Sequence, residues 1–471
     1  MTTTGSTAGA PKQEQYDTGR AVLLATVAAL GGFLFGFDTA VINGAVTAIR
    51  DQFEMGAGLT GFAVSSALLG CALGAWGAGR IADRQGRIRV MLLSSLLFTV
   101  SAIGSGLAVG AWDLILWRLV GGLGVGAASV IAPAYIAEIS PASIRGRLGS
   151  LQQLAIVTGI FIALLTDYFL ATAAGGAAEE LWLGLEAWRW MFMSEAVPAV
   201  AYGIMALQIP ESPRYLVARG RDKDARSVLK QVLKTGIDQR MREIKRTVST
   251  EARSSVRDLR GPALGLLPIV WVGIALSLFQ QFVGINVIFY YSSTLWRSVG
   301  FSEDDALLQT VITSVTNIVV TVVAIAIIDK IGRRLLLLVG SAGMFVSLGV
   351  LAVTFAQARL VDGEPVLDGA AGVTALIAAN GFVVFFGASW GPAVWVLLGE
   401  MFNNRIRASA LGLAAAAQWI GNFVISTTFP ALSSIGLSLA YGLYTFFALL
   451  SFFFVLKFVK ETKGRELEDM E

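Results

Sequence analysis

Three charged side chains stand inside stretches of sequence that are otherwise apolar over the length of a membrane helix: Asp38, Arg118 and Glu195. An ionisable side chain at the centre of a bilayer costs at least ~2.5–3.5 kcal/mol, so such residues carry ions or protons, or pair with one another. Opposite charge on separate segments makes Asp38 and Arg118 natural partners, and protonation of Asp38 would release Arg118. A static structural ion pair is the alternative, and Glu195 could simply be a glutamate that faces water.

Neutral amide side chains form a second group inside other apolar stretches: Gln153, Gln280, Gln281, Asn286 and Asn317. An amide donates and accepts hydrogen bonds without carrying a net charge. Several amides that converge from different helices therefore suit a neutral polyol, and they suit a carboxylate or a cation poorly. Any single amide could instead join two helices by a hydrogen bond.

Aromatic residues accompany these amides. Trp419 follows Gln418, and Trp395 lies near the middle of its apolar stretch. An indole face can pack on the C–H face of a sugar ring while its N–H donates to a hydroxyl group. A tryptophan near a helix end more often marks the membrane interface. Phe35 and Tyr290 are further candidates for lining or gating residues.

The elements that position these residues are membrane helices. The chain has 471 residues, of which 55% are apolar and 15% charged, whereas soluble domains carry about 25% charge. Apolar runs of about 20 residues can cross the bilayer as helices. We predict twelve spans in an all-α membrane protein, at about 21–43, 58–80, 89–110, 113–137, 148–171, 188–208, 264–295, 306–328, 334–356, 372–399, 407–430 and 434–458. We expect the two longest, 264–295 and 372–399, to be tilted or broken.

The composition also bears on chemistry. The chain has no histidine, which excludes histidine proton relays and histidine metal ligands. It shows neither a phosphate-binding loop nor a metal-ligand cluster, so we expect no enzyme, no cofactor, no metal site and no nucleic-acid partner. The short first external loop, about 44–57, and the absence of glycosylation sequons favour a bacterial inner membrane.

One hydrophilic segment divides the chain. Residues Glu211–Arg260 contain 14 Lys/Arg and 7 Asp/Glu, a net charge of +7, which leaves −4 for the remainder of a chain of net +3. The positive-inside rule places this segment in the cytoplasm, and an even number of spans then places both termini there. We expect short amphipathic helices in it, for example Asp222–Leu233, although a solvated linker is possible.

Matching motifs indicate an internal repeat. Gly79–Arg87 follows the second span and Asp329–Arg334 follows the eighth, and in each half a glutamate precedes an arginine by seven residues. Two six-helix halves follow, with a substrate site near the midplane between them. The domains we predict are 21–208 and 264–458 for the halves, 209–263 for the cytoplasmic linker and 459–471 for the tail.

Together these motifs resemble the sugar porter family of the major facilitator superfamily, over roughly residues 21–465. The resemblance lies in Gly31–Gly44, Gly79–Arg89, Trp117–Gly122, Tyr135–Glu138 with Arg145–Arg147, Pro210–Arg214, Gln280–Asn286 and Trp390–Pro392 with Trp395. The chain departs from the family at Lys460, where proline is usual, and at Ile88, where a basic residue is common.

The resemblance implies a proton-coupling role for Asp38 and Arg118, tuned by Glu195, and sugar binding by the amides with Gln418, Trp395 and Trp419. An apolar Ile160 favours a hexose over xylose. The resemblance also implies a cytoplasmic charge network that controls conformation, although exposed surface charge is the alternative. Its members are Asp83, Arg84, Arg87, Glu138, Arg145, Glu211, Asp329, Arg333, Arg334, Glu400, Arg407 and Glu461.

We therefore expect a major facilitator fold and a proton-coupled symporter that imports a hexose, with glucose the first candidate, by alternating access. A sugar facilitator without proton coupling is the nearest alternative; a drug antiporter or a sugar sensor fits less well. The expected partners are a monosaccharide, a proton and membrane lipid, and we expect a monomer that crosses the cell membrane many times.

Overall fold

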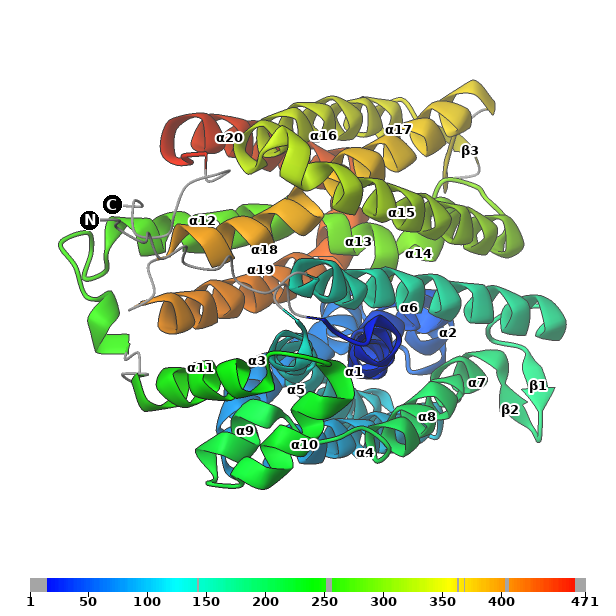
Figure 1. Cartoon of the computed structure of the whole chain (residues 1–471). Coiled ribbons are helices and arrows are strands. Elements are labelled where there is room, and N and C mark those ends of the chain that lie inside the picture. Colours follow the sequence, from blue (N-terminus) through cyan, green and yellow to red (C-terminus); the bar gives the residue numbers. More distant parts are fainter. Residues whose placement is uncertain are drawn as a thin grey trace, which may run out of the picture.

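The structure is a computed structural model that describes residues 15–141, 144–250, 256–361, 364–367, 369–402 and 406–461. It is a bundle of long helices, in which an N-terminal set (the first half) packs beside a C-terminal set (the second half), as Figure 1 shows. The predicted all-α membrane fold is confirmed.

The first half runs from α1 to α8, with one short hairpin. Its elements are α1 Thr18–Ala40, α2 Ile42–Gln52, α3 Ala57–Gln85, α4 Arg87–Gly106, α5 Ala111–Ile139, α6 Arg145–Ala174, β1 Glu180–Trp182, β2 Leu185–Glu186, α7 Ala187–Ser194 and α8 Ala196–Ala206. The strands β1 and β2 pair antiparallel.

A linker joins the halves: α9 Pro213–Ala218, α10 Asp222–Val232, α11 Ile237–Thr250 and the 3₁₀ turn η1 Val256–Leu259. Helix α10 confirms the amphipathic helix predicted at Asp222–Leu233. Its apolar side, including Ala225 and Leu229, is buried against α9 and α11 in a small core of the linker's own.

The second half runs from α12 to α20. Its elements are α12 Pro268–Phe282, α13 Ile285–Tyr290, α14 Ser292–Arg297, α15 Glu303–Ile331, α16 Arg333–Ala356, β3 Arg359–Val361, β4 Glu364–Val366, α17 Gly369–Ala388, α18 Trp390–Met401, α19 Arg407–Ile435 and α20 Leu437–Phe458. The strands β3 and β4 form a second antiparallel hairpin.

Eleven helical segments in the described residues are long and apolar enough to cross a membrane. The predicted span at 188–208 is not among them, because it is divided into α7 and α8 by an interruption at Glu195. The predicted breaks are present too: 264–295 is divided into α12, α13 and α14, and 372–399 into α17 and α18. The first span is longer than predicted, since α2 continues to Gln52.

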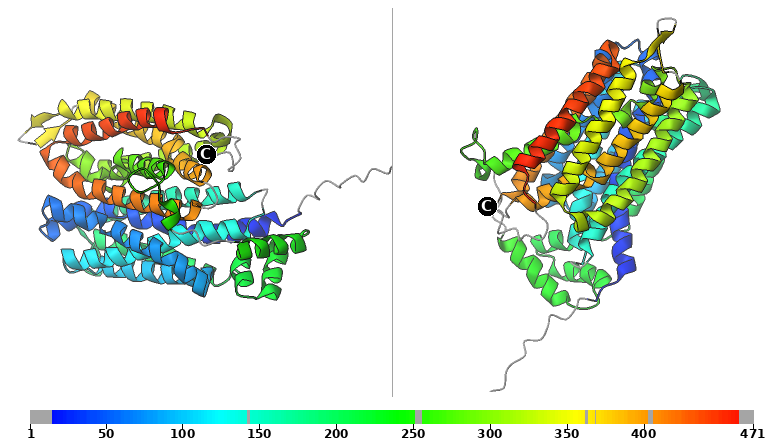
Figure 2. Two further views of the ribbon diagram at one scale, coloured as in Figure 1. Left: turned by 90° about the vertical axis from the view of Figure 1, so that its left-hand side faces the viewer. Right: turned by 90° about the horizontal axis from the view of Figure 1, so that it is seen from above.

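The two ends of the bundle differ. At one end, which we call the linker end, α9–α11 lie beyond the membrane helices, and the described termini lie there as well (Figures 1 and 2). The N-terminal segment joins the linker through backbone hydrogen bonds from Asp17 to Val232 (2.8 Å) and from Lys234 to Gln15 (2.8 Å). The hairpins β1–β2 and β3–β4 lie at the opposite end, which we call the far end.

The halves meet along two helix pairs, α3 with α19 and α6 with α15. One buried apolar cluster includes residues of both halves, among them Phe37, Ile49, Ile288 and Phe429. A second cluster, which includes Leu24, Val90 and Tyr135, has all its buried members in the first half and the linker. The apolar core is therefore continuous between the halves in one region and separate in another.

Candidate functional site

The structure brings Asp38 and Arg118 together in the middle of the first half. Arg118 Nη1 in α5 lies 3.3 Å from Asp38 Oδ1 in α1 and donates to the Asp38 backbone carbonyl oxygen at 2.8 Å. Each side chain is only 2% exposed. Gly121, one turn beyond Arg118, permits this approach, because a Cβ atom there would lie 3.0 Å from Asp38 Oδ1.

Glu195 completes this buried group. Glu195 is 1% exposed and lies close enough to Asp38 and Arg118 for their charges to interact. Asp38 Oδ2, Arg118 Nε and Glu195 Oε1 have no hydrogen-bond partner among the described residues. One cation thus lies beside two buried acids.

The amides of the second half form a chain around a helix break. Asn286 Nδ2 in α13 donates to Gln281 Oε1 in α12 at 2.6 Å. Gln281 Nε2 lies 3.5 Å from Gln280 Oε1, and Gln280 Nε2 donates to the backbone carbonyl oxygen of Trp390 at 2.9 Å. The break between α12 and α13 is thereby tied to the break between α17 and α18, where Trp390 begins α18.

Aromatic rings extend from these amides to the first half. The rings of Phe35 in α1 and Trp419 in α19 are 5.6 Å apart between centroids, so this contact joins the halves. Tyr290, at the end of α13, accepts a 3.4 Å hydrogen bond at its hydroxyl group from Asn422 Nδ2 in α19. Sequence reasoning missed Asn422, which is a further amide in an apolar span.

Other predicted site residues lie in the membrane helices and form no hydrogen bond with the amide chain in the described structure. Gln153 and Ile160 are half-buried on α6, and Gln418 is half-buried on α19. Asn317 on α15 is buried and lies beside Gly387 of α17. Trp395 on α18 is 42% exposed.

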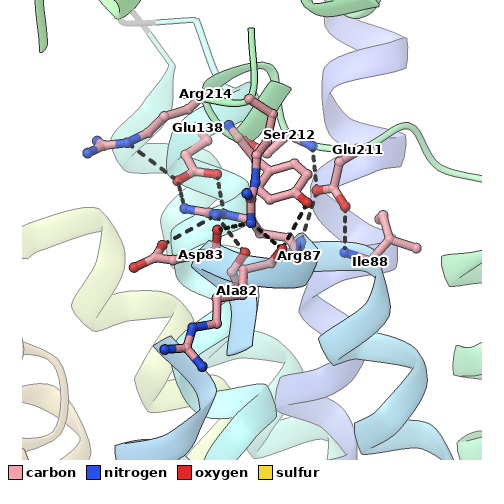
Figure 3. Close-up of polar contacts among 11 residues, drawn as sticks. Ala82, Asp83, Arg87, Ile88, Glu138, Glu211, Ser212 and Arg214 are labelled. Atoms are coloured by element: carbon pink, nitrogen blue, oxygen red, sulfur yellow. Dashed lines mark hydrogen bonds and ion pairs between the residues drawn. The ribbon is translucent and has the colours of Figure 1, made fainter. Parts of the chain in front are cut away.

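A cluster of charged side chains joins α4, α5 and the start of the linker at the linker end (Figure 3). Arg87 donates to both carboxylate oxygens of Glu138, at 3.0 and 2.9 Å, and lies 3.6 Å from Asp83. Glu211 accepts from the backbone N–H groups of Arg87 (2.9 Å) and Ile88 (3.2 Å) at the first turn of α4. We call Asp83, Arg87, Glu138 and Glu211 the first-half cluster.

The second half repeats this arrangement. Arg333 Nη2 donates to Glu400 Oε1 at 2.8 Å. Glu461 accepts from the backbone N–H groups of Arg333 (3.0 Å) and Arg334 (3.1 Å) at the first turn of α16. We call Arg333, Glu400 and Glu461 the second-half cluster. In each half, a carboxylate from just beyond the last helix binds the N-terminus of a helix, where the helix dipole favours a negative charge.

A glycine precedes each of these helices for the same physical reason. Gly86 and Gly332 both have φ +98°, a conformation that side chains with a Cβ atom disfavour. A Cβ atom would also lie 2.2 Å from Glu211 Oε2 at Gly86, and 2.7 Å from Glu461 Oε2 at Gly332. The glycines therefore make both the turn and the approach of the carboxylate possible.

The remaining members of the predicted charge network are placed less closely. Arg84 is exposed, and its backbone carbonyl oxygen accepts from the side chains of Arg219 and Tyr215. Arg334 donates from Nη2 to the carbonyl oxygen of Leu456 at 2.9 Å. The side chains of Arg145, Asp329 and Arg407 lie outside the described part of the structure.

Comparison with known proteins decides the family. The family model described as "Sugar (and other) transporter" matches residues 24–471. A glucose transport protein of Synechocystis sp. is 60% identical and is covered over 99% of its length by 98% of this chain. The D-xylose-proton symporter of Escherichia coli is 37% identical, with 97% of this chain and 96% of that protein covered.

This chain belongs to the sugar transporter family.

Solved structures agree with that assignment. The proton:xylose symporter XylE bound to 6-bromo-6-deoxy-D-glucose has a TM-score of 0.79 with the transporter at 37% identity, covering 97% of this chain and 99% of that one. A partially occluded inward-open conformation of XylE from E. coli has a TM-score of 0.81 at 35% identity, covering 95% of this chain and 100% of that one.

The halves of the transporter are joined at the far end by hydrogen bonds of two kinds. Glu303 and Asp304 at the start of α15 accept from the Ala177 backbone N–H (2.8 Å) and the Thr172 hydroxyl group (3.3 Å) of the first half, and a larger set joins neutral groups. Asn43 Nδ2 in α2 donates to the carbonyl oxygen of Phe289 at 2.8 Å, and Asn43 Oδ1 accepts from the backbone N–H of Ser293 at 3.1 Å. The hydroxyl groups of Thr47 and Thr294 are 3.3 Å apart. We call these residues, together with Ser65 and Thr427, whose hydroxyl groups are 2.6 Å apart, the far-end clamp.

Sequence reasoning overlooked two further residues, Asn43 and Asp167. Asn43 stands inside the motif Gly31–Gly44 but was not singled out, because nothing local shows that it reaches the other half. Asp167 is a further fully buried acid, in α6. The criterion that identifies Asp38, an acid inside an apolar span, would also have found Asp167.

Proposed function

We propose that the transporter imports a hexose together with a proton by alternating access, and that glucose is the first sugar to test. The names of the relatives support this substrate class: a glucose transport protein at 60% identity, the D-xylose-proton symporter at 37% and the glucose transporter GlcP of Staphylococcus epidermidis at 35%.

The observation that carries the proposal is the buried group of Asp38, Arg118 and Glu195. Arg118 is the cation beside two acids, and three of the group's polar atoms have no partner within the described structure. A proton that binds Asp38 removes its attraction for Arg118 and changes which contacts between α1 and α5 are favoured. Since Asp38 and Phe35 lie on the same helix and Phe35 contacts Trp419, such a change would reach the interface between the halves.

The sugar would bind between this interface and the amide chain. Gln280, Gln281 and Asn286 supply donors and acceptors without charge, which match hydroxyl groups. Discontinuous helices near the midplane, such as α12–α13 and α17–α18, are typical substrate sites in transporters built from repeats. We propose that Gln153, Asn317, Trp395, Gln418 and Trp419 line the same site, with Ile160 favouring a hexose.

We also propose an orientation of the transporter in the membrane. The positive charge of the linker favours the cytoplasm for the linker end and for both termini, so the far end would face outside. With the far-end clamp formed, the site would be closed to the outside. The charge clusters would hold each half together as it moves, and the division into halves at 208 and 264 would mark the moving bodies. We propose a monomer in the lipid bilayer of the cell membrane.

The test is uptake of labelled glucose into proteoliposomes under an inward proton gradient, with and without a protonophore. The proposal requires transient accumulation above equilibrium that the protonophore abolishes. Xylose and arabinose, tested in parallel, would establish the sugar preference. Uptake that only equilibrates would make the protein a facilitator with a static Asp38–Arg118 pair.

Two variants assign the roles within the site. Asp38→Asn is expected to abolish accumulation but to permit exchange of sugar, because a neutral residue cannot couple to the proton gradient. Gln281→Ala is expected to weaken sugar binding in calorimetry about tenfold, as expected for loss of hydrogen bonds in a binding site. An Asp38→Asn protein that still accumulates sugar would remove Asp38 from the coupling mechanism.

A further inference from the structure

Asp167 is a buried acid to which the proposed mechanism gives no role. It lies in α6 and is fully buried. Its Oδ2 atom accepts a 3.2 Å hydrogen bond from the backbone N–H of Gly44 in α2, while Oδ1 has no hydrogen-bond partner among the described residues. The Gly44 backbone and the Asp167 side chain approach so closely that a Cβ atom on residue 44 would lie 2.6 Å from Asp167 Cβ.

Asp167 differs from Asp38 because no cation among the described residues pairs with it. The elements packed against α6 are α1, α2, α5, α7, α15 and β1. The charged residues of these elements that come nearest to the depth of Asp167 in the bundle are Asp38, Arg50, Asp51, Asp113, Arg118, Glu180, Arg189, Glu303, Asp304 and Asp305. In the described structure none of these forms a hydrogen bond or an ion pair with Asp167. An ionised carboxylate that is buried without a cation is costly, and proteins relieve that cost by binding a proton or by moving the group into water.

The position of Asp167 connects it to the far-end clamp. Its partner Gly44 follows Asn43, which binds Phe289 and Ser293 of the other half. Gly44 is six residues beyond Asp38, about 9 Å along the helix axis at 1.5 Å per residue. Asp167 therefore lies between the coupling acid and the far end, next to the residue that joins the halves there.

We propose that Asp167 is a second proton-binding residue of the transport cycle, which controls the far-end clamp through Gly44. The ionised carboxylate is a strong acceptor for the Gly44 N–H group, and a protonated carboxyl group is a weaker one. Proton uptake by Asp167 thus loosens α2 and Asn43 and favours opening of the far end; proton loss favours closure. The inference rests on the proposed function, in which the far end opens during the cycle.

The test measures the opening of the far end directly, without sugar. Spin labels at Val109→Cys and Ile435→Cys report the distance between the halves, because both sites are exposed, at 86% and 74%, and lie at helix ends on opposite halves. Cys71 is the one native cysteine and is buried, so the labels attach selectively. Distance distributions are recorded from about pH 5 to pH 8 in Asp38→Asn and in Asp38→Asn/Asp167→Asn, so that any contribution of Glu195 is common to both.

The expected result is a pH dependence that requires Asp167. In Asp38→Asn, the ratio of open to closed far ends rises as the pH falls, by up to about tenfold per pH unit for one proton. Adding Asp167→Asn raises the ratio and removes the part of the pH dependence that Asp167 contributes, because a neutral amide mimics the protonated acid. The same pH dependence in both proteins would overturn the proposal. Thr166→Val, a neighbouring change on α6 that removes an intrahelical bond to Ile162, is the matched control and keeps the dependence.

A second variant tests the same contact in case Asp167→Asn does not fold. Gly44→Ala removes no charge but displaces Asp167, so it should raise the open population at every pH. An unchanged distance distribution in Gly44→Ala would contradict the proposed connection. Since neither measurement uses sugar, failure of the accumulation assay and failure of this inference are distinguishable.

Discussion

The two charge clusters at the linker end and the far-end clamp use different chemistry. At the linker end, the first-half and second-half clusters use charged groups, and the contacts that define each cluster lie within one half and its adjoining segment. At the far end, the clamp uses amide, hydroxyl and backbone groups, and its contacts cross from one half to the other.

This difference suggests two tasks: one set of contacts keeps each half folded, and the other breaks and forms again when the halves move. A buried ion pair is costly to break once formed, which suits contacts that must persist while each half moves as a body. A neutral hydrogen bond contributes only about 0.5–1.5 kcal/mol net, so a few of them can hold a gate that must open repeatedly. The predictions below test whether each end does only the task that its chemistry suits.

Substitutions of two glycines on α3 should have the largest effects, one at the far end and one within the first half. A Cβ atom at Gly61 would lie 2.1 Å from the Thr427 carbonyl oxygen across the halves, and one at Gly70 would lie 2.3 Å from the Leu119 carbonyl oxygen within the first half. Gly61→Val should reduce the closed population at the far end by up to about 100-fold while the melting temperature changes little, since overpacking costs about 1–3 kcal/mol. Gly70→Val should lower the melting temperature by about 2–6 °C for the same cost.

These two variants are compared by thermal unfolding and by labelling of cysteines placed at the far end. Equal loss of thermal stability in both would mean that the far-end contacts are needed for folding, and the separation of tasks would fail.

Arg87→Ala addresses the first-half cluster. Its removal leaves the Glu138 carboxylate, whose side chain is 11% exposed, without its bidentate partner, and we expect a loss of about 3 kcal/mol in the free energy of unfolding. Arg333→Ala should cost about half as much, because Glu400 is 32% exposed and water stabilises it. Denaturant unfolding in detergent measures both losses. Arg87→Lys is the matched variant, because it keeps the positive charge but cannot donate two parallel hydrogen bonds to Glu138. A larger loss for Arg333→Ala would reverse this order.

Asn43→Ala addresses the clamp. It removes two hydrogen bonds to the other half, to Phe289 and Ser293, and should shift the halves toward the open far end by about tenfold. The accessibility of a cysteine near Thr294 to a water-soluble reagent reports this shift. Asn43→Asp keeps the acceptor for Ser293 but points an oxygen at the Phe289 carbonyl oxygen and adds a buried charge, so we expect a larger shift than for Asn43→Ala. A labelling rate equal to that of the unchanged protein would show that Asn43 does not hold the gate.

Thr47→Val gives the smallest expected effect. The 3.3 Å contact with Thr294 is partly exposed, so water can replace it, and the open population should change by no more than about twofold. A shift as large as that of Asn43→Ala would place the centre of the clamp nearer to the surface than the buried bonds indicate.

Much of the fold could be predicted because the bilayer imposes it. Helix-length apolar runs, one basic linker and matching motifs after the second and eighth spans are sufficient for two repeated halves. The span at 188–208 shows the limit. Hydropathy sees one segment there, whereas the structure divides the helix at Glu195. The physical reason is Pro198, which has no backbone N–H to donate to the Ser194 carbonyl oxygen four residues earlier.

Candidate residues for the site could be named one by one from the sequence, but their arrangement could not. Asp38 and Arg118 stand out because charge is rare in apolar spans, and their pairing follows from their opposite signs. That Gln280 binds the backbone of Trp390, or that Glu211 and Glu461 bind helix N-termini, depends on how distant segments meet, and no local pattern encodes it. Asn43 and Asp167 act across helix interfaces, so their partners appear only in three dimensions.

The carboxylates at helices α4 and α16 have a consequence for biosynthesis. Glu211 lies directly after the last helix of the first half, and the bonds it makes to Arg87 and Ile88 join the end of that half to its interior. Once residue 211 has been synthesised, the chain contains every member of the first-half cluster. Since domains generally fold as units during synthesis, the first six spans can be complete in the membrane before the ribosome reaches the second half, and Glu461 makes the same contacts for that half.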